Sequence, residues 1–302
     1  MAAKVVVALL TERQEFQLMQ AADARECAAR AGLDVEVLFA DDNAVRQIQQ
    51  LFARIHAPQT ERPVAIIVET VTGEGLERVA TNAVKASIGW VLINRKVTYL
   101  DALRRECPPG LLIASVSVDN EEVGRIQGRQ LRALLPQGGL VLYLQGPAGT
   151  STAHERLLGA QKAVAGAGIE LKVLRNDDWT AGTGEKVVTT WLRLKTSEGC
   201  HPAVVCAQND TLAVGARRAI LAHRPEWSRL AFTGCDGLPE GGQKLVRTGE
   251  LTATIVTATP AGPAVTLVAR ALAGEKVPAE VWLTPRSHPA EEELARRVRS
   301  AG

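Results

Sequence analysis

The feature that most constrains this fold is an alternation of short apolar runs and longer amphipathic stretches along nearly the whole chain. The apolar runs are rich in Val, Ile and Leu and do not alternate with polar residues, which is the pattern of strands buried on both faces. The predicted strands are Val5–Leu10, Val35–Phe39, Val64–Val68, Trp90–Ile93, Leu112–Val116, Leu140–Leu144, Leu171–Leu174, Ala203–Ala207, Leu230–Gly234 and Ala253–Val256.

Stretches of helical periodicity separate most of these strands. Asn43 is a suitable N-cap for one helix, and Gly32 is a suitable C-terminal residue for another. The predicted helices are Phe16–Arg30, Ala44–Ile55, Leu76–Ala86, Glu122–Leu135, Ala153–Ala165, Gly184–Lys195, Thr211–His223, Pro260–Ala273 and Glu291–Arg299. Alternating strands and helices predict parallel sheets with right-handed crossovers, the doubly wound α/β class.

So many strands are unusual for one sheet, and two sheets of about five or six strands each fit better. The order of elements before Asp119–Asn120 resembles the order after it. We therefore predict two similar doubly wound parallel-sheet lobes with a ligand cleft between them. Ligands of open parallel sheets bind outside the carboxyl ends of the strands, so the side chains that follow strands are the candidate site residues.

Composition and charge exclude several classes of protein. Hydrophobic residues make up 46% and charged residues 23% of the 302 residues, which is typical of a globular chain long enough for two lobes. The net charge of +2 gives no reason to expect a nucleic-acid partner. Apolar runs such as Val64–Val68 are too short to cross a bilayer. Met1–Lys4 leads directly into Val5–Leu10 without the pattern of a signal peptide.

The common catalytic and cofactor motifs are missing from the sequence. No GxGxxG follows the first strand, and there is no P-loop, GxSxG or HExxH motif. The five cysteines are odd in number and form no CxxC pair, so we expect buried free thiols rather than disulfides or a zinc site. We therefore expect no catalytic residue, no metal and no cofactor.

Polar segments follow several predicted strands in the second half of the chain. They are QGPAGTSTAHER over residues 145–156, AQNDTLAVGA over 207–216, TGCDGLPEG over 233–241 and GELTATI over 249–255. In this order and spacing they resemble the type I periplasmic sugar-binding family, in particular its ribose-binding branch. The resemblance covers nearly the whole chain and is strongest from Asp119 to Ile255. Regulators of the lactose-repressor type share this fold but carry an N-terminal DNA-binding module, of which this sequence has no sign.

The resemblance implies ligand contacts in the second lobe from Arg156, Trp179, Asn209, Asp236 and Thr257. Sugar hydroxyls both donate and accept hydrogen bonds, so a carboxylate, a forked guanidinium and an amide all suit them. Trp179 would cover an apolar face of the sugar. Each residue also has a structural alternative: a turn for Asp236, a helix N-cap for Asn209–Asp210, a surface position for Arg156 and packing for Trp179.

In the first lobe the resemblance implies ligand contacts from Arg13, Glu15, Phe16, Glu69, Asn94 and Arg95. Phe16 and Arg95 match the ribose-binding pattern. Glu15 stands where the family has an aromatic residue, and Asn94 stands where it has an acid. Arg13 and Glu69 replace asparagines. These departures widen the candidate ligands from ribose to a charged or amino-bearing sugar or another polyol. The alternative for Arg13 and Glu15 is that both point to solvent.

The resemblance also implies how the lobes are joined. The family crosses between its lobes three times, and the matching positions here are Val118–Asp119, Thr257–Ala258 and Leu283–Thr284. A three-stranded hinge would therefore join an N-terminal lobe of residues 1–118 and 258–283 to a C-terminal lobe of residues 119–257 and 284–302. Such a hinge permits closure around a ligand.

The leading hypothesis is a substrate-binding protein that closes around a small polar ligand, a sugar or sugar derivative, for an ABC-type uptake system. Its partners would be that ligand and a membrane transporter, without nucleic acid. It would be a monomer in the periplasm, or in the cytoplasm if Met1 is the native start. A ligand sensor that reports to a signalling partner is one alternative. The other is an α/β enzyme acting on a sugar, which would need a carboxylate pair such as Asp210 with Asp236 or Glu15 with Glu69.

Overall fold

The computed structural model describes residues 2–194 and 199–301. The chain divides into two compact units. Unit 1 comprises Met1–Val118 and Thr259–Leu283, and unit 2 comprises Asp119–Ala258 and Thr284–Gly302. Ala258 falls in unit 2, whereas the sequence analysis places it in the first lobe.

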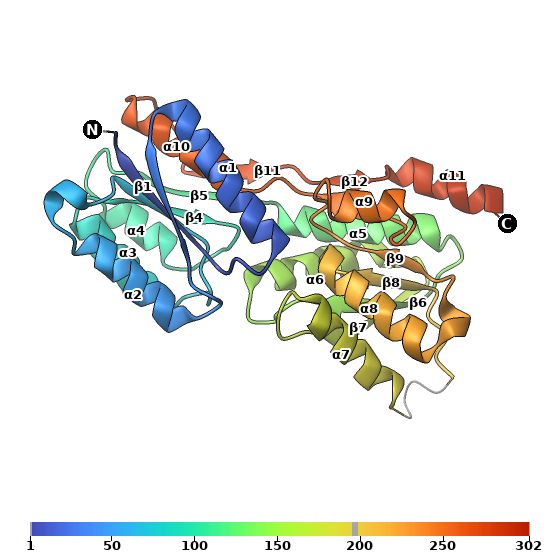
Figure 1. The fold of residues 1–302 in the computed structure, drawn as a ribbon. Helices are drawn as coiled ribbons and strands as arrows, with labels where there is room; N and C mark the ends of the chain where they lie inside the picture. Colours follow the sequence, from blue (N-terminus) through green and yellow to red (C-terminus); the bar gives the residue numbers. More distant parts are fainter. Residues whose placement is uncertain (1, 195–198, 302) are drawn as a thin grey trace. The chain divides into compact units, whose positions relative to one another are not determined.

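Unit 1 is built on a six-stranded sheet in the order β11-β5-β4-β3-β1-β2, with every neighbouring pair parallel. Its strands are β1 (Lys4–Leu9), β2 (Asp34–Phe39), β3 (Ala65–Val68), β4 (Gly89–Ile93), β5 (Ile113–Val118) and β11 (Glu280–Leu283). Its helices are α1 (Glu15–Ala31), α2 (Ala44–Ile55), α3 (Glu77–Lys85), α4 (Leu100–Glu106) and α10 (Ala261–Leu272), with a short 3-10 turn η1 (Gln59–Glu61). Figure 1 shows α1 beside α10, and α2 beside α3.

Strand β1 shows why the central strands are apolar at every position. Successive residues of a strand point to opposite faces of the sheet. Val5 and Leu9 pack in the same cluster as α1 and α10, whereas Val6 and Ala8 pack with α2, α3 and α4. Because helices cover both faces of the sheet, no position of the strand is left for a polar side chain.

Unit 2 contains a parallel sheet in the order β7-β6-β8-β9 and an antiparallel pair, β10 with β12. The strands are β6 (Gly139–Gln145), β7 (Ile169–Arg175), β8 (Val204–Ala207), β9 (Ala231–Thr233), β10 (Thr254–Val256) and β12 (Arg286–His288). The helices are α5 (Asn120–Leu134), α6 (Ser151–Val164), α7 (Ala181–Leu192), α8 (Asp210–His223), α9 (Gly242–Arg247) and α11 (Glu291–Ala301), with a 3-10 turn η3 (Pro225–Trp227). Helices α5 and α6 cover one face of the sheet, and α7 and α8 cover the other.

The predicted fold class, with parallel sheets in two α/β lobes, is confirmed. Among the described residues, two strands and two α-helices were not predicted, besides the short 3-10 turns η1 and η3. Strand β11 is an edge strand whose residues alternate between exposed and half-buried. Strand β12 has only three residues, Arg286, Ser287 and His288, and all three are polar or charged. Helices α4 and α9 have seven and six residues, too few to show a helical period. The predicted helix Gly184–Lys195 corresponds to α7, which begins at Ala181 and ends at Leu192. Lys195, the last residue of the prediction, lies outside the described residues.

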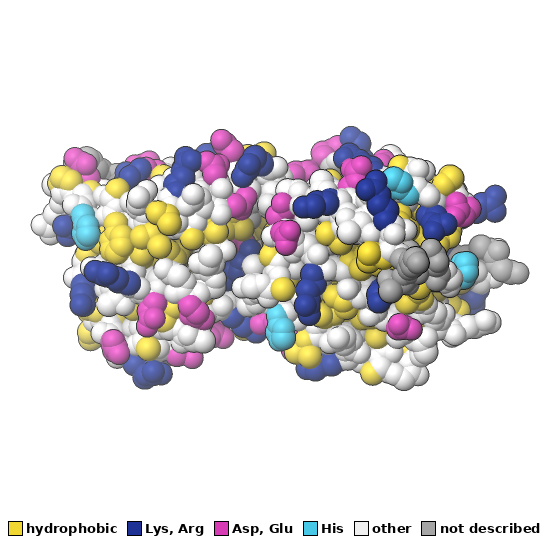
Figure 2. Space-filling model, turned by 90° about the horizontal axis from the view of Figure 1, so that it is seen from below, with side chains coloured by type: hydrophobic (Ala, Val, Ile, Leu, Met, Phe, Trp, Pro, Cys, Tyr) yellow, Lys and Arg dark blue, Asp and Glu magenta, His cyan; other side chains and the backbone are white. Residues whose placement is uncertain are grey.

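The expectation of buried free thiols holds for only two of the five cysteines. All five cysteines are free thiols, but only Cys206 and Cys235 are buried, and the other three are half-buried. Figure 2 shows Lys and Arg side chains interspersed with Asp and Glu over the visible face of each unit, which fits the small net charge. Over residues 2–194 and 199–301, no helix combines the length and apolar character needed to cross a membrane.

Glu36 lies in β2, the edge strand of the unit 1 sheet, and forms ion pairs with Arg54 and Lys4. Its carboxylate accepts hydrogen bonds from Arg54 Nε at 2.9 and 3.0 Å and lies 2.8 Å from Lys4 Nζ. The hydrogen bond from Arg54, together with Lys4, lowers the pKa of Glu36 to about 2, although burial acts in the opposite direction. A carboxyl group with a depressed pKa in the folded state stabilises the protein above its unfolded pKa and loses that effect as the pH falls.

We predict that Glu36→Gln lowers the free energy of unfolding at pH 7 and that the difference from the wild type shrinks between about pH 4.5 and pH 2. Urea unfolding at pH 7 and pH 3 measures this. Glu26→Gln is the matched control, because the Glu26–Arg30 pair is 67% exposed at both side chains and exposed pairs contribute little. An equal destabilisation by Glu36→Gln at both pH values would contradict the prediction.

Candidate functional site

The candidate site residues of unit 2 follow neighbouring strands at the carboxyl edge of the sheet. Asn209 and Asp210 lie just after β8, and Asp236 lies shortly after β9. Thr257 comes directly after β10. Asp236 and Val256 form a parallel bridge, so the segment after β9 runs beside the end of β10. Parallel strands end at the same edge of a sheet, which is how residues far apart in sequence gather here.

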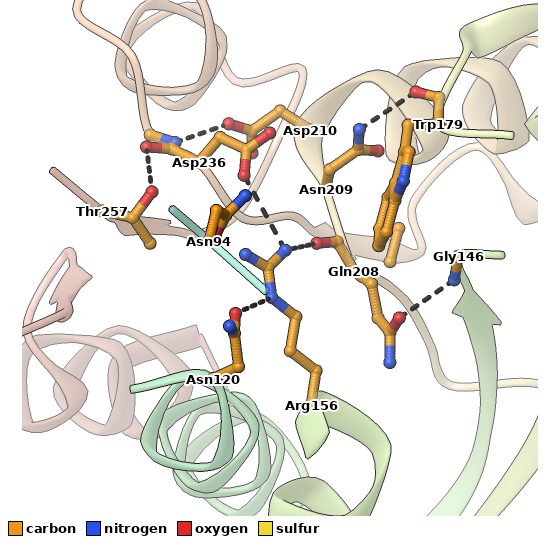
Figure 3. Close-up of polar contacts among 12 residues, drawn as sticks. Asn94, Asn120, Gly146, Arg156, Trp179, Gln208, Asn209, Asp210, Asp236 and Thr257 are labelled. Carbon is orange, nitrogen blue, oxygen red and sulfur yellow. Dashed lines mark hydrogen bonds and ion pairs between the residues drawn. The ribbon is translucent and has the colours of Figure 1, made fainter. Parts of the chain in front are cut away.

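Arg156 lies at the centre of this group (Figure 3). Its Nε donates to Asn120 Oδ1 at 3.0 Å, and its Nη1 donates to the carbonyl oxygen of Gln208. The same Nη1 lies 3.8 Å from Asp236 Oδ1, and the side chains of Arg156 and Asp236 are 5% and 17% exposed. The alternative of a surface position for Arg156 is therefore wrong, because its side chain is buried. Its buried charge is fixed by one amide, one backbone carbonyl and one carboxylate.

Two glycines explain how Arg156 reaches this position. A Cβ at Gly124 of α5 would lie 2.0 Å from the carbonyl oxygen of Arg156, and a Cβ at Gly159 of α6 would lie 2.1 Å from that of Glu121. No side chain fits at either point, so α5 and α6 pack backbone against backbone. This close approach brings Asn120, at the start of α5, within hydrogen-bond distance of Arg156 on α6.

Trp179 lies in the loop between β7 and α7 and is half-buried. Its indole ring packs on Gly146, where a Cβ would lie 2.2 Å from the ring. The guanidinium of Arg156 lies 5.9 Å from the ring centre, within the range of a cation–π contact. Asn209 Nδ2 donates to the carbonyl oxygen of Trp179 at 3.0 Å and so fixes the loop (Figure 3).

Asn209 also acts as a helix cap, since its Oδ1 accepts the backbone N–H of Leu212 at 2.8 Å. The N-cap alternative therefore holds for Asn209, while Asp210 is the first residue of α8. Both ends of the Asn209 side chain take part in protein contacts, and an amide carries a second N–H that these contacts do not use.

Asp210 organises the segment that carries Asp236. Its Oδ1 accepts from Thr254 Oγ1 at 2.6 Å, and its Oδ2 accepts from the N–H of Gly237 at 2.8 Å. Asp236 has a φ of 98°, which is uncommon for a residue other than glycine. Its carbonyl oxygen accepts from the N–H of Thr257 at 3.2 Å and from Thr257 Oγ1 at 3.4 Å. Asp210 and Thr257 therefore hold the two ends of the same peptide group, the one between Asp236 and Gly237, next to the Asp236 carboxylate.

Gln208 was missed by the sequence analysis. Its Oε1 accepts the N–H of Gly146 at 3.0 Å, and its Nε2 donates to the Tyr143 hydroxyl at 3.1 Å and to the carbonyl oxygen of Ala153 at 2.9 Å. The Tyr143 hydroxyl donates to Gln127 Oε1 at 2.7 Å. Burial raises the pKa of Tyr143 well above its ordinary value, which keeps this hydroxyl protonated. The signal in the sequence is a glutamine directly after a buried strand.

In unit 1 the buried carboxylate of Glu69, which follows β3, gathers the polar residues. Glu69 Oε2 accepts from Gln17 Nε2 at 2.9 Å and from Gln20 Nε2 at 2.7 Å. Its Oε1 accepts from Asn94 Nδ2 at 3.0 Å and lies 3.2 Å from Arg95 Nη2. Asn94 and Arg95 follow β4, the strand next to β3, and both are buried. The structure therefore brings Glu69, Asn94 and Arg95 together, in contact with one another.

The other three candidates of unit 1 lie near the start of α1. Arg13 is exposed, its Nε donates to Thr11 Oγ1 at 3.2 Å, and its Nη2 lies 3.6 Å from Asp42 Oδ2. Glu15 is exposed at the first position of α1, and Phe16 is half-buried. Both Arg13 and Glu15 are thus exposed to solvent, which agrees with the alternative that these two side chains point to solvent. Within residues 2–194 and 199–301, no group of three or more His, Cys, Asp and Glu side chains is arranged to hold a metal ion.

Comparison with known proteins places this geometry in a family. A family model described as a periplasmic binding protein domain matches residues 5–276. The ribose import binding protein of Salmonella typhimurium is 32% identical over 203 residues, which are 66% of this chain and 64% of that protein. The match thus spans slightly less than two thirds of that relative's own length. The ribose import binding protein of Escherichia coli is 28% identical over 234 residues, 77% of this chain and 71% of that protein.

Solved structures show the same fold at lower sequence identity. The myo-inositol binding protein of Caulobacter, solved with myo-inositol, superimposes with a TM-score of 0.81. It is 21% identical, and the superposition covers 98% of this chain and 97% of that one. At this identity the likeness concerns the fold.

We predict that Gly146→Ala displaces the Trp179 indole and lowers the free energy of unfolding by about 1–3 kcal/mol, because the new methyl group overlaps the ring. Near-UV circular dichroism and urea unfolding measure the two effects. Gly149→Ala is the matched control, since a Cβ there meets nothing within 4 Å. It should leave the spectrum unchanged. A Gly146→Ala variant with the spectrum and stability of the wild type would show that Trp179 does not pack there.

Proposed function

Because this chain belongs to the family of periplasmic binding proteins, we propose that it is a substrate-binding protein for a small polyhydroxyl ligand, a sugar or a polyol. The observation that carries the proposal is the group formed by Arg156, Asp236 and Trp179 in unit 2. A buried guanidinium, a carboxylate on a fixed backbone and an aromatic ring lie together at the carboxyl edge of a parallel sheet. The names of the relatives, which are ribose import proteins, point to the same class of ligand.

Each of these groups suits one feature of a sugar. The Asp236 carboxylate accepts hydrogen bonds from hydroxyl groups, and Arg156 donates to hydroxyl or ring oxygens. Asn209 donates through the N–H that its contacts with Leu212 and Trp179 leave over. The indole of Trp179 covers the C–H face of a sugar ring. Thr257 acts on the ligand through Asp236, whose carbonyl oxygen it binds.

We propose that Asn94 and Arg95 of unit 1 contribute further hydrogen bonds to the same ligand. Their position after β4, at the carboxyl edge of the other parallel sheet, supports this role. Phe16, at the start of α1, would add apolar contact. Closure of the two units around the ligand would remove it from water, which makes each matched hydrogen bond favourable and each unmatched polar group costly.

We further propose that a membrane transporter of the ABC type receives the ligand from this protein and that the protein acts as a monomer in the periplasm. The relatives named as import binding proteins support the transporter, and the family description, a periplasmic binding protein domain, supports the compartment. Carboxylate pairs for an enzyme find no support in the geometry. The Asp210 carboxylate is bound by Thr254 and Gly237, and the Glu69 carboxylate is bound by four side chains.

A thermal-shift screen tests the proposal. The panel consists of D-ribose, D-allose, D-fructose, D-galactose, L-arabinose and myo-inositol, with amino acids and nucleosides as unrelated polar compounds. A ligand present at 100 times its Kd stabilises the folded protein by about 2.7 kcal/mol, which raises the melting temperature by about 5–10 °C. Stabilisation by none of the sugars or polyols, or only by an amino acid or nucleoside, would overturn the proposal.

We predict that Asp236→Asn weakens the affinity for the sugar found in this screen about 100-fold, because a charged acceptor becomes a neutral amide. Asparagine suits this test since it tolerates positive φ better than alanine does. Isothermal titration calorimetry measures the affinity. Asp177→Asn, an identical change at an exposed residue in the same loop as Trp179, is the control and should bind like the wild type. Equal affinity of Asp236→Asn and the wild type would remove Asp236 from the site.

A further inference from the structure

We propose that Gln208 is a positioning residue, which holds Arg156 and the support of Trp179 in the places where these two side chains bind the ligand. It acts from behind the site, through a buried ring of hydrogen bonds that it forms with Gln127 and Tyr143. This inference rests on the proposed function and deepens it, because it adds a residue on which the affinity depends although its side chain does not touch the ligand.

The ring of hydrogen bonds begins and ends at the carboxyl end of β8. Gln127 Nε2, on α5, donates to the carbonyl oxygen of Ala207 at 2.9 Å, and its Oε1 accepts from the Tyr143 hydroxyl at 2.7 Å. That hydroxyl accepts from Nε2 of Gln208, the residue after Ala207, at 3.1 Å. Gln127, Tyr143 and Gln208 are all 0% exposed. The ring therefore closes through the backbone of residues 207–208, away from solvent.

Backbone groups set the direction of each hydrogen bond in this ring. A carbonyl oxygen can only accept, so Gln127 presents its Nε2 to the backbone and its Oε1 to Tyr143. The N–H of Gly146 can only donate and the carbonyl oxygen of Ala153 can only accept, so Gln208 presents Oε1 to the first and Nε2 to the second. The amide of Gln208 therefore has one favourable orientation rather than two.

Gln208 contacts helix α6 at two points that lie one turn apart. Its Nε2 donates to the carbonyl oxygen of Ala153 at 2.9 Å, and its own carbonyl oxygen accepts from Arg156 Nη1. Residues three apart on a helix lie on the same face, so both contacts are made on the side of α6 that faces the end of β8. Gln208 thus holds the first turn of α6 together with the guanidinium that this helix carries.

The same amide supports the aromatic part of the site. Gln208 Oε1 accepts the N–H of Gly146 at 3.0 Å, and Figure 3 shows Gln208 between Gly146 and Arg156. The indole of Trp179 packs on Gly146, where a Cβ would lie 2.2 Å from the ring. A displacement of Gly146 would therefore displace the indole. Through one residue, the structure sets the positions of both the guanidinium and the ring, which lie 5.9 Å apart.

A neutral hydrogen-bonded network suits this task better than apolar packing does. Every polar side-chain atom of Gln127, Tyr143 and Gln208 has a hydrogen-bond partner. A satisfied buried network of this kind favours a single arrangement. Removing one member leaves buried donors or acceptors without partners, which favours rearrangement of the backbone that carries the site.

The test uses Gln208→Met and Tyr143→Phe. Methionine keeps the length of glutamine but removes the amide, and phenylalanine removes a single oxygen atom behind Gln208, so the second variant tests the ring even if the first does not fold. Gln130→Met is the matched control. Gln130 is also 0% exposed, and its Nε2 also donates twice, to the carbonyl oxygen of Thr254 at 3.0 Å and to Ser287 Oγ at 2.9 Å.

The first measurement is made without ligand. The indole N–H resonance of Trp179 is followed by two-dimensional NMR and is identified among the five tryptophans by its loss in Trp179→Phe. We expect this resonance to shift in Gln208→Met and in Tyr143→Phe, because the support of the ring moves. Gln130→Met should leave it in place.

The second measurement is the affinity, determined by calorimetry with D-ribose and with the compound of the sugar and polyol panel that stabilises the wild type most. We expect Gln208→Met to weaken binding about tenfold and Tyr143→Phe about threefold. Gln130→Met should bind within about twofold of the wild type, although its melting temperature falls by about 5 °C, as that of Gln208→Met does. This difference separates positioning of the site from a general loss of stability.

Wild-type affinity in Gln208→Met overturns the proposal, and so does a loss of affinity that Gln130→Met shares in full. Weaker binding with an unmoved Trp179 resonance in both ring variants would indicate that Gln208 contacts the ligand directly, which also overturns it. The resonance needs no ligand, so the two proposals fail separately. A wild type that binds no sugar or polyol contradicts the proposed function, whereas an unmoved resonance contradicts the positioning role.

Discussion

A guanidinium that is almost wholly buried needs a partner for its charge and acceptors for its N–H groups, and much of unit 2 is arranged to supply them to Arg156. Asn120 comes from the start of α5, the Gln208 carbonyl from the end of β8, and the Asp236 carboxylate from the segment after β9. The backbone that carries Asp236 is in turn held by Asp210 and Thr257. The chemistry of one side chain therefore sets the geometry at the ends of several strands.

In unit 1 the group that needs partners is a buried acid instead of a buried arginine. Its buried acid is the Glu69 carboxylate, whose partners are amides from α1, the amide of Asn94 directly after β4, and the guanidinium of Arg95. In both units an arginine and an acid lie at the carboxyl edge of a parallel sheet, and amide side chains occupy the remaining hydrogen-bonding positions. Amides suit this task because they satisfy donors and acceptors without adding charge.

The sequence was sufficient for the parts of the fold in which each residue has one clear environment. Strands such as β1 were predictable because both of their faces are buried, and Ala44–Ile55 was predicted with the bounds it has. Strand β11 was not predicted, because an edge strand is covered only in part and lacks a continuous apolar run. Short helices such as α4 give too few residues for a period to appear.

The candidate site was predictable in its members but not in their roles. Position after a strand and a family resemblance pointed to Glu69, Asn209 and Asp236, and the sequence also offered a helix cap for Asn209. No spacing in the sequence reveals that four side chains bind the Glu69 carboxylate or that Asn209 also binds the Trp179 carbonyl oxygen. Such roles depend on neighbours far away in the sequence, as with Gln17 and Glu69, which lie 52 residues apart. Gln208 was overlooked because a neutral amide after a strand resembles an ordinary loop residue.

The glycine contacts between helices have a consequence for how such a protein acquires a new ligand. Where α5 meets α6 at Gly124 and Gly159, and where α7 meets α8 at Gly215, a Cβ would lie 2.0–2.1 Å from a backbone oxygen of the facing helix. These helices have no layer of side chains between them whose size evolution could adjust to shift one helix against the other. Under the proposed function, a change of ligand preference in unit 2 would therefore come from exchanging side chains at strand ends, while the backbone at these helix contacts stays in place.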